Sequence, residues 1–597
     1  MCGFLAEFNL SDDYSDGLQP TIDSNAEAYI LRRGPDGLQK LKEENFEISF
    51  ARLAITDIEH GVQPFYTTNG FLAFGNGEIY NSYEISNQLE LSTDVVTKIG
   101  FNDIKIAAEL LSIDPRRNWE KLDGMFSICL YSPKGEIYFG RDRVGEKPAF
   151  FYVSGSRLIV GSSAEAVAKQ VGRGLELDSE QLNNWLAFGG CDPGSTFFSE
   201  IKEVRPGTVR TFQNTKADEF TYWGWPVRGS RLQLQDNYLT QITQATERCR
   251  SKDFDGCLLW SGGVDSTVLR VSLSLNGFTP DSIHISFKEK SFNEELPNIP
   301  KSDQGSQIFT TLFDDWISQS TIETAISLMD QPISDAACLP MLAACMQAKK
   351  NDFKVVYTGD GADEVFQGYD AIKKESHLTF IVALLGLFPN FFLRGTFALF
   401  SRKSDSNYIS KTSIILRLIS AASAPKGTRK QILVSPNFYI ASKFPQVLGN
   451  ISSGQSINLE KYFQSFVLPQ IYLQKTDRMS AGIGLEARSP WLSLFFIQTS
   501  MSFSQKLLKK MGKPFSHLLP DRENWRRKKK HGLGVHLKPV LELLQKPNWE
   551  IPNLSLQTLD EIWFRALNGG ASAQNAAWSL FVLNQKLNSW RVAKILK

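Results

Sequence analysis

The sequence predicts two domains, an α+β layered domain built from antiparallel strands followed by an α/β domain with a parallel sheet. Three observations lead to this prediction. A chain of 597 residues is too long for a single hydrophobic core. Its first 210 or so residues contain short apolar runs broken by Gly, Asn and Asp, which is typical of strands in hairpins. Beyond residue 235, a buried strand, a glycine-rich turn and a helix follow one another, as at the start of a nucleotide-binding fold.

Composition narrows the functional classes. Lysine plus arginine (65) nearly balances aspartate plus glutamate (64), so net charge gives no reason to expect a nucleic-acid or acidic-membrane partner. The basic run at residues 525 to 530 has no interleaved aromatic residues, and we interpret it as solvated surface rather than a nucleic-acid patch. The seven cysteines are scattered and include no CxxC pair, which favours neither a disulfide framework nor a zinc site.

Two segments bear on membranes and location. The N-terminus lacks the basic start and long apolar core of a signal peptide, so we expect the cytoplasm. The most apolar stretch, residues 378 to 400, is interrupted by Gly386, Pro389, Asn390 and Arg394. Because a spanning helix needs about 20 largely apolar residues, we expect no membrane span. A buried helical hairpin is the favoured interpretation, and contact with a membrane surface is the alternative.

The strands of the first domain are expected in four segments. These are residues 46–56 (FEISFARLAIT), 70–81 (GFLAFGNGEIYN), 125–142 (MFSICLYSPKGEIYFGRD) and 149–163 (AFFYVSGSRLIVGSS). Around residues 213 to 235 the chain becomes polar and loses periodicity, which indicates a linker. The predicted domains therefore span residues 1–212 and 236–597.

The second domain shows helical spacing at residues 234–250, a strand at CLLW (257–260) and a helix at VLRVSLSL (268–275). A second buried strand, KVVYTG (354–359), leads into another Gly/Asp turn at residues 359–364. The rest of the chain is expected to be mostly helical. Between the first strand and helix, residues 261–267 read SGGVDST, where glycines, backbone N–H groups and the hydroxyls of Ser266 and Thr267 can hold phosphate oxygens. This is not the Walker pattern.

The N-terminus offers a nucleophile. Cys2 follows the initiator methionine, whose removal would place its thiol beside its own α-amine, a base with a pKa near 7.7 to 8. Asn76 and Gly77 offer donors for an oxyanion. Arg52 could pair with a substrate carboxylate, and Glu78 and Asp103 could accept from a substrate ammonium. Taken one at a time, each of these residues is more typical of a surface charge or a turn.

The first half resembles the glutaminase half of the asparagine synthase family. The matching segments are MCG, RRGPDG (32–37), ARLAITD (51–57), NGEIYN (76–81), GMFSICLY (124–131) and GRDRVGEKP (140–148). This resemblance implies an N-terminal nucleophile fold, with two antiparallel sheets between helices and Cys2 as nucleophile. It also implies a glutamine site formed by Arg52, Leu53, Ala54, Ile55, Thr56, Asn76, Gly77, Glu78 and Asp103. The sequence departs from the family at Arg32, Ala51 and residues 102–105.

The second half resembles the synthase half of the same family. The matching segments are HISFKEKSFNE (284–294), DQPISDAACLP (330–340), TGDGADEVFQGY (358–369), LQKTDRMS (473–480), LEARSPWL (485–492) and KKHGLGV (529–535). By this resemblance, ATP is bound by Trp260, Ser261, Gly262, Gly263, Val264, Asp265, Ser266, Thr267, Ile285, Thr358 and Gly359. Asp265 and Asp363 would bind Mg²⁺, Asp360 would guide or deprotonate the amine, and Lys530 would neutralise charge on the α-phosphate. Departures occur at Gln331, Ser493 and residues 295–320.

The resemblance implies an ATP-dependent ligase that uses glutamine as amido donor. Cys2, Asn76 and Gly77 would hydrolyse glutamine, and the released ammonia would attack an acyl-adenylate formed from ATP and aspartate. Three alternatives stay open: another carboxylate, such as the uronic acid of a surface polysaccharide precursor; an intramolecular amide former similar to β-lactam synthetases or lasso-peptide cyclases; and a scaffold that has lost catalysis. A homodimer is the usual prior for such an enzyme.

Overall fold

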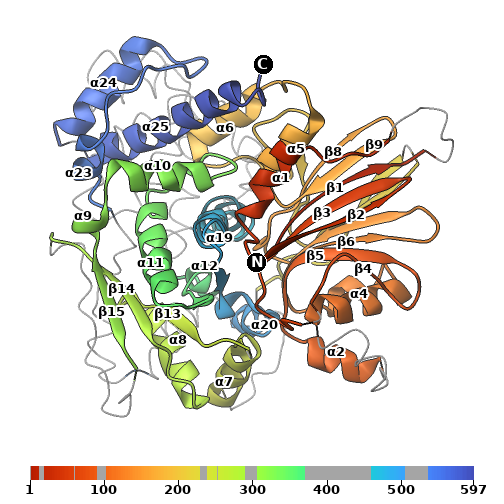
Figure 1. Cartoon of the computed structure of the whole chain (residues 1–597). Helices are drawn as coiled ribbons and strands as arrows, with labels where there is room; N and C mark the ends of the chain where they lie inside the picture. Colours follow the sequence, from red (N-terminus) through yellow and green to blue (C-terminus); the bar gives the residue numbers. More distant parts are fainter. Residues whose placement is uncertain are drawn as a thin grey trace, which may run out of the picture.

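The computed structural model describes residues 2–11, 19–59, 61–89, 102–214, 216–228, 238–251, 253–289, 306–369, 459–503, 519, 535–569 and 571–597. Two antiparallel sheets occupy one side of the molecule, and a parallel sheet with most of the helices occupies the other (Figure 1). The two-domain fold class predicted from the sequence is therefore confirmed. Lys530, the basic run at residues 525–530 and the apolar stretch at residues 378–400 lie outside the described residues.

The first antiparallel sheet has the strand order β10-β8-β9-β1-β3-β2. Helices α1 (Ser24–Leu31) and α5 (Ala164–Val171) pack on its outer face, against β1 and β9. Its strands are β1 (Gly3–Asn9), β2 (Gly37–Glu43), β3 (Phe46–Arg52), β8 (Phe150–Ser154), β9 (Arg157–Gly161) and β10 (Lys202–Glu203).

The second antiparallel sheet has the order β12-β11-β7-β6-β5-β4 and packs face to face with the first. Aromatic rings fill the layer between them, with the ring of Phe4 lying 5.3 Å from that of Phe74 and 6.0 Å from that of Phe139. Helices α2 (Ser82–Gln88) and α4 (Asp103–Ile113) lie beside the second sheet, and α4 packs directly on it. Its strands are β4 (Phe65–Tyr66), β5 (Leu72–Ile79), β6 (Gly124–Tyr131), β7 (Ile137–Arg141), β11 (Thr208–Gln213) and β12 (Lys216–Thr221).

Strand β12 corrects the predicted domain boundary. The sequence indicated a linker from residue 213, but residues 216 to 221 pair with β11 and form an edge of the second sheet. The strand escaped detection because its side chains are exposed or only half-buried, so it shows no apolar alternation. The first domain therefore continues into the segment predicted as a linker.

The parallel sheet has the order β15-β14-β13-β16-β17. Alternate residues face opposite sides: Leu258 packs with helices α7 (Tyr238–Arg248) and α8 (Val264–Leu275), whereas Cys257 packs with α11 (Cys338–Lys350). The predicted strands at residues 257–260 and 354–359 and the helix at 268–275 are confirmed. The strands are β13 (Gly256–Leu259), β14 (Ser282–Ser286), β15 (Ile308–Leu312), β16 (Val355–Tyr357) and β17 (Glu486–Arg488).

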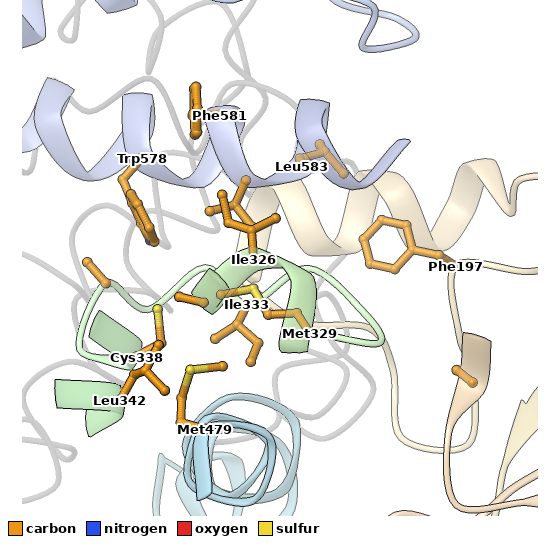
Figure 2. Packing of buried hydrophobic residues seen from close by; sticks show 14 of the residues in the cluster. Phe197, Ile326, Met329, Ile333, Cys338, Leu342, Met479, Trp578, Phe581 and Leu583 are labelled. Carbon is orange, nitrogen blue, oxygen red and sulfur yellow. The ribbon is translucent and has the colours of Figure 1, made fainter. Parts of the chain in front are cut away.

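The largest core cluster continues from one domain into the other. Figure 2 shows Trp578 of the C-terminal helix near Ile326 and Ile333, with Met479 and Phe197 in the same cluster.

Within the part of the chain that the structure describes, no helix combines the length and hydropathy that a membrane span requires. The remaining helical segments are α6 (Ser179–Phe188), α9 (Phe313–Trp316), α10 (Gln319–Leu328), α12 (Ala362–Phe366), α18 (Leu459–Tyr462), α19 (Leu473–Ala481), α20 (Leu494–Ser502), α23 (Leu537–Glu542), α24 (Leu556–Leu567), α25 (Ala571–Val592), two 3₁₀ turns (Asn118–Lys121, Pro490–Leu492) and a π-helical stretch (Phe463–Tyr472).

Candidate functional site

Cys2 lies at the start of β1, in the layer between the two antiparallel sheets. It packs against the same cluster as Phe4, two residues further along the strand, because side chains alternate along a strand. Its thiol donates to the carbonyl of Leu53 at 3.8 Å. Burial raises the pKa of this thiol, whereas the positive amino terminus of the chain and the Leu53 contact lower it. Cys2 is only half-buried, and the other six cysteines are fully buried.

Asn76 faces the same layer from the opposite sheet. It is 0% exposed on β5, next to Ser127 of β6, and it alternates with Leu72 and Phe74, which pack in the inter-sheet cluster. Among the described residues, neither its side-chain nitrogen nor its oxygen has a hydrogen-bond partner, and the same is true of the Ser127 hydroxyl. Buried polar groups are almost always hydrogen-bonded. These three atoms therefore indicate a place where a polar ligand or water belongs, in the layer that holds Cys2.

Gly77 must be a glycine. Its φ is +138°, and a Cβ at this position would lie 1.9 Å from the carbonyl oxygen of Met125. Any side chain would therefore push β5 and β6 apart next to Asn76.

Glu78 and Asp103 form an acidic pair beside these residues. Asp103 begins α4 and accepts from the backbone N–H of Ile79 at 2.7 Å, which brings it close to Glu78. Burial raises the pKa of both carboxyls, and the charge of Glu78 raises the pKa of Asp103 further. A cation placed beside two neighbouring buried carboxylates would favour their charged forms. The structure therefore brings together the two residues expected to accept a substrate ammonium.

The segment at residues 52–56 forms a loop held from several sides. The Arg52 guanidinium donates to the carbonyls of Asp57 (2.7 Å) and Ile58 (2.9 Å), and the Thr56 hydroxyl donates to Glu78 at 2.9 Å. Leu53 and Ile55 belong to a core cluster of the second domain. The predicted glutamine loop is therefore built at the contact between the two domains.

The predicted phosphate loop joins β13 to α8. Gly262 has a φ of +83°, and Ser261 donates to or accepts from Ser266 at 3.1 Å and accepts from the N–H of Gly263 at 3.2 Å. Trp260 points inward, since its indole N–H donates to Thr267 at 3.0 Å and its ring lies under the guanidinium of Arg270. Trp260 and Thr267 thus support the loop from the interior of the domain. Ile285, on the neighbouring strand β14, is only half-buried.

The second Gly/Asp turn meets this loop. A Cβ added at Gly359 would lie 3.4 Å from the backbone nitrogen of Ser266 and 3.7 Å from the Cβ of Asp265. Thr358 is fixed by Ser489, whose hydroxyl lies 2.8 Å from that of Thr358. The Asp360 carboxylate accepts from the Thr476 hydroxyl of α19 at 2.7 Å. The carboxyl ends of β13 and β16 therefore gather the predicted nucleotide residues at one edge of the parallel sheet, where such ligands bind.

Carboxylates accumulate at this edge. Burial, with the charges of Asp360 and Asp265, raises the pKa of Glu364 to about 7, although the hydroxyl of Tyr369 donates to Glu364 and acts to lower it. Asp363 precedes Glu364 on α12. In the described ranges, no group of three or more His, Cys, Asp or Glu side chains could hold a metal ion. Mg²⁺ binds through one or two carboxylates plus substrate phosphates, so the site would need no more than the carboxylates of Asp265 and Asp363 to hold this ion.

A buried ion network that the sequence did not indicate joins the domains. Arg33 forms two hydrogen bonds with Asp477 of α19 (2.7 and 2.9 Å), and its Nε donates to the carbonyl of Cys2 at 3.4 Å. Arg33 and Arg478 hold the pKa of Asp477 well below its usual range against the effect of burial. Both residues lie in matched motifs, but their pairing joins positions 444 apart in the chain.

Two departures from the family pattern lie at domain contacts. The side-chain oxygen of Gln331 accepts from the backbone N–H of Phe197 at 3.2 Å. Ser493 precedes α20, and the backbone N–H of the next residue, Leu494, donates to Asp123 of the first domain at 3.0 Å. The buried hydroxyl of Ser493 itself has no hydrogen-bond partner among the described residues.

The fold and the two sites define a class of protein. A half-buried cysteine and an unpartnered asparagine lie in a layered antiparallel domain, and a glycine phosphate loop lies in an adjoining parallel-sheet domain. This combination is that of a glutamine amidotransferase joined to an ATP-using domain.

Comparison with known proteins gives the family. A model described as glutamine amidotransferase domain matches residues 1–223, and one described as asparagine synthase matches residues 237–590. The chain therefore belongs to the asparagine synthase family, whose members use ATP, and it is an ATP-dependent ligase that takes nitrogen from glutamine.

Relatives are distant. Glutamine-hydrolyzing asparagine synthetase 1 of Bacillus subtilis (strain 168) is 24% identical over 533 residues, covering 86% of this chain and 82% of that protein. Glutamine-hydrolyzing asparagine synthetase 3 of the same strain is 24% identical over 501 residues, covering 77% and 75%. A solved structure of B. subtilis glutamine phosphoribosylpyrophosphate amidotransferase aligns with 60% of this chain and 81% of its own at 12% identity, with a TM-score of 0.26, which is too low to support an argument.

Proposed function

We propose that this chain is a glutamine-dependent asparagine synthase. After removal of Met1, the α-amine of Cys2 takes the thiol proton, and the thiolate attacks the carboxamide carbon of glutamine. The side chain of Asn76 and the N–H of Gly77 hold the oxyanion, Arg52 holds the α-carboxylate, and Glu78 and Asp103 hold the α-ammonium. Ammonia leaves, and water hydrolyses the thioester to glutamate.

The second site activates the acceptor. Ser261 to Thr267 would hold the phosphates of ATP, and Ile285, Thr358 and Gly359 would contact the nucleoside or its α-phosphate. Trp260, which points inward, would support the phosphate loop through Thr267. Asp265 and Asp363 would hold Mg²⁺, which supplies charge neutralisation for the pyrophosphate leaving group. The β-carboxylate of aspartate is adenylated, and ammonia guided by Asp360 displaces AMP to give asparagine. Lys530 is proposed to stabilise the charge that develops on the α-phosphate.

One observation carries the proposal: helix α19 contacts both sites through adjacent residues. Thr476 donates to Asp360 of the ATP site, and Asp477 binds Arg33, which donates to the carbonyl of Cys2. Two sites held by neighbouring residues of one buried helix are suited to passing ammonia through the interior. Such a path matters because ammonia released into water would be protonated and lost.

The test measures glutamate and pyrophosphate release with glutamine, Mg-ATP and aspartate. A Cys2→Ala variant and ammonium in place of glutamine separate the two half-reactions. We expect aspartate to drive pyrophosphate release, and the variant to work only with ammonium. Glutaminase activity without aspartate-dependent pyrophosphate release would reject asparagine as product and direct the search to other carboxylates, sugar acids first.

A further inference from the structure

Arg488 is a buried cation of the ATP domain that reaches into the first domain. It lies on β17 with its side chain 1% exposed. Its Nε pairs with Glu486 of the same strand at 2.8 Å, and its Nη1 donates to the carbonyl of Cys249 at 3.1 Å. Its Nη2 lies 3.2 Å from Glu78 Oε2 across the domain boundary, an ion pair that lacks the geometry of a hydrogen bond.

The charges around Glu78 make this contact necessary. Three buried carboxyls lie in one region: Glu78, Asp103 and Glu486. The charge of Glu486 raises the pKa of Glu78, and the charges of Glu78 and Glu486 raise the pKa of Asp103. Arg488 and the positive amino terminus of the chain are the cations that lower the pKa of Glu78. Without Arg488, burial and like charge would favour a protonated Glu78, which cannot form an ion pair with a substrate ammonium.

The two oxygens of Glu78 have different surroundings. Thr56 donates to Oε2, and Arg488 also lies against Oε2. In the part of the chain that the structure describes, Oε1 takes part in none of the hydrogen bonds or ion pairs of Glu78, and the side chain keeps 15% exposure. One oxygen is therefore fixed, and the other is left for a ligand.

We propose that Arg488 is a positioning residue of the glutamine site, supplied by the ATP domain, which fixes Glu78 ionised with Oε1 directed to the α-ammonium of glutamine. This inference rests on the proposed role of Glu78. The ion pair between Arg488 and Glu78 would make the affinity for glutamine depend on both domains being assembled, rather than on the first domain alone.

The same residue also contacts the nucleotide site, but through its backbone. The carbonyl of Arg488 accepts from the N–H of Thr358 at 2.9 Å, and the next residue, Ser489, lies 2.8 Å from the Thr358 hydroxyl. The side chain of Arg488 therefore contacts the glutamine site, and its main chain contacts the ATP site. A side-chain substitution can separate the two roles.

The test compares Arg488→Met with Lys586→Met in the full-length enzyme. Lys586 is a matched control because it is also a buried cation, 4% exposed, that pairs across the domain contact, with Glu165. For Arg488→Met we expect KM for glutamine to rise about 10- to 100-fold, the range of one charge-assisted contact. Glutaminase kcat and ammonium-dependent pyrophosphate release should stay within about threefold of wild type. Lys586→Met should leave KM for glutamine unchanged.

Removing one partner of a buried ion pair destabilises strongly, so Arg488→Met is paired with the double variant Arg488→Met/Glu486→Gln. The double variant removes one positive and one negative charge together. If the single variant does not fold, KM for glutamine is measured in the double variant instead. An unchanged KM for glutamine in a folded Arg488 variant overturns the inference. Absence of glutaminase activity in the wild type would instead reject the proposed function.

Discussion

Replacing Asn76 by alanine is expected to make the enzyme nearly inactive as a glutaminase without making it less stable. Asn76 is 0% exposed, and neither of its side-chain polar atoms has a partner among the described residues. Each unsatisfied buried polar group costs about 1–3 kcal/mol of folding free energy. Removing two of them recovers at most about 2–6 kcal/mol, and less where a bound water already satisfies them. The smaller side chain loses a further part through the cavity left in the inter-sheet layer.

The net stability change should lie between zero and about 2 kcal/mol in favour of Asn76→Ala. For a domain of this size, that corresponds to an unfolding temperature raised by up to about 4–8 °C. Activity should change in the opposite direction. Loss of one oxyanion donor lowers kcat about 10²- to 10³-fold, whereas ammonium-dependent pyrophosphate release should not change.

Asn118→Ala is the matched control. Asn118 is also buried, at 5% exposure, but its side-chain nitrogen donates to the carbonyl of Leu110 at 2.7 Å. Its replacement leaves that carbonyl unpaired and should destabilise by about 1–3 kcal/mol, with glutaminase activity retained. Glutamate release and thermal unfolding are measured for both variants. If Asn76→Ala retains glutaminase activity and loses as much stability as Asn118→Ala, the assignment of Asn76 to the oxyanion is wrong.

Three further predictions test other parts of the molecule. Iodoacetamide should label one cysteine per native chain, at a rate that rises with pH because burial raises the pKa of Cys2, and mass spectrometry of Cys2→Ala should show no label. Asp363→Asn should raise the Mg²⁺ concentration needed for pyrophosphate release at least about tenfold and leave glutamate release unchanged; an unchanged Mg²⁺ dependence would remove Asp363 from the metal site. Asp477→Asn should lower the free energy of unfolding by about 3–5 kcal/mol at pH 7. Because the folded pKa of Asp477 is depressed, its contribution is present above about pH 4 and is lost as pH falls below that value, so urea titrations of wild type and variant should converge in acid.

Local patterns were enough to predict much of the fold. Strands β5 and β6 and the turn between β13 and α8 follow from alternation, glycine placement and short apolar runs, which depend only on neighbours in the chain. Strand β12 was assigned to a linker because an exposed edge strand has no buried face to create alternation. The glutamine and nucleotide residues came from motif resemblance, and the structure places Glu78 with Asp103 and Gly359 with Ser266.

The long-range pairs could not be predicted from the sequence. Arg33 lies 444 residues from Asp477, and nothing in either motif specifies which of the 65 lysines and arginines meets which of the 64 acidic residues. Pairing of this kind is decided by how two finished domains pack, because a charge can enter a buried contact only beside a partner. Gln331 illustrates the same limit, since its hydrogen bond to Phe197 is visible only once the domains are assembled.

These contacts change how the glutaminase domain should be regarded. Leu53 and Ile55 pack in the core of the ATP domain, Arg33 is held by Asp477, and Glu78 is faced by Arg488. Three parts of the proposed glutamine site are thus positioned by the second domain. A displacement of β17 or α19 on nucleotide binding would move Glu78 or the carbonyl of Cys2 through contacts that already exist. Since both elements also touch Thr358 or Asp360, glutamine affinity and occupancy of the ATP site should be thermodynamically linked, with the same factor in either direction.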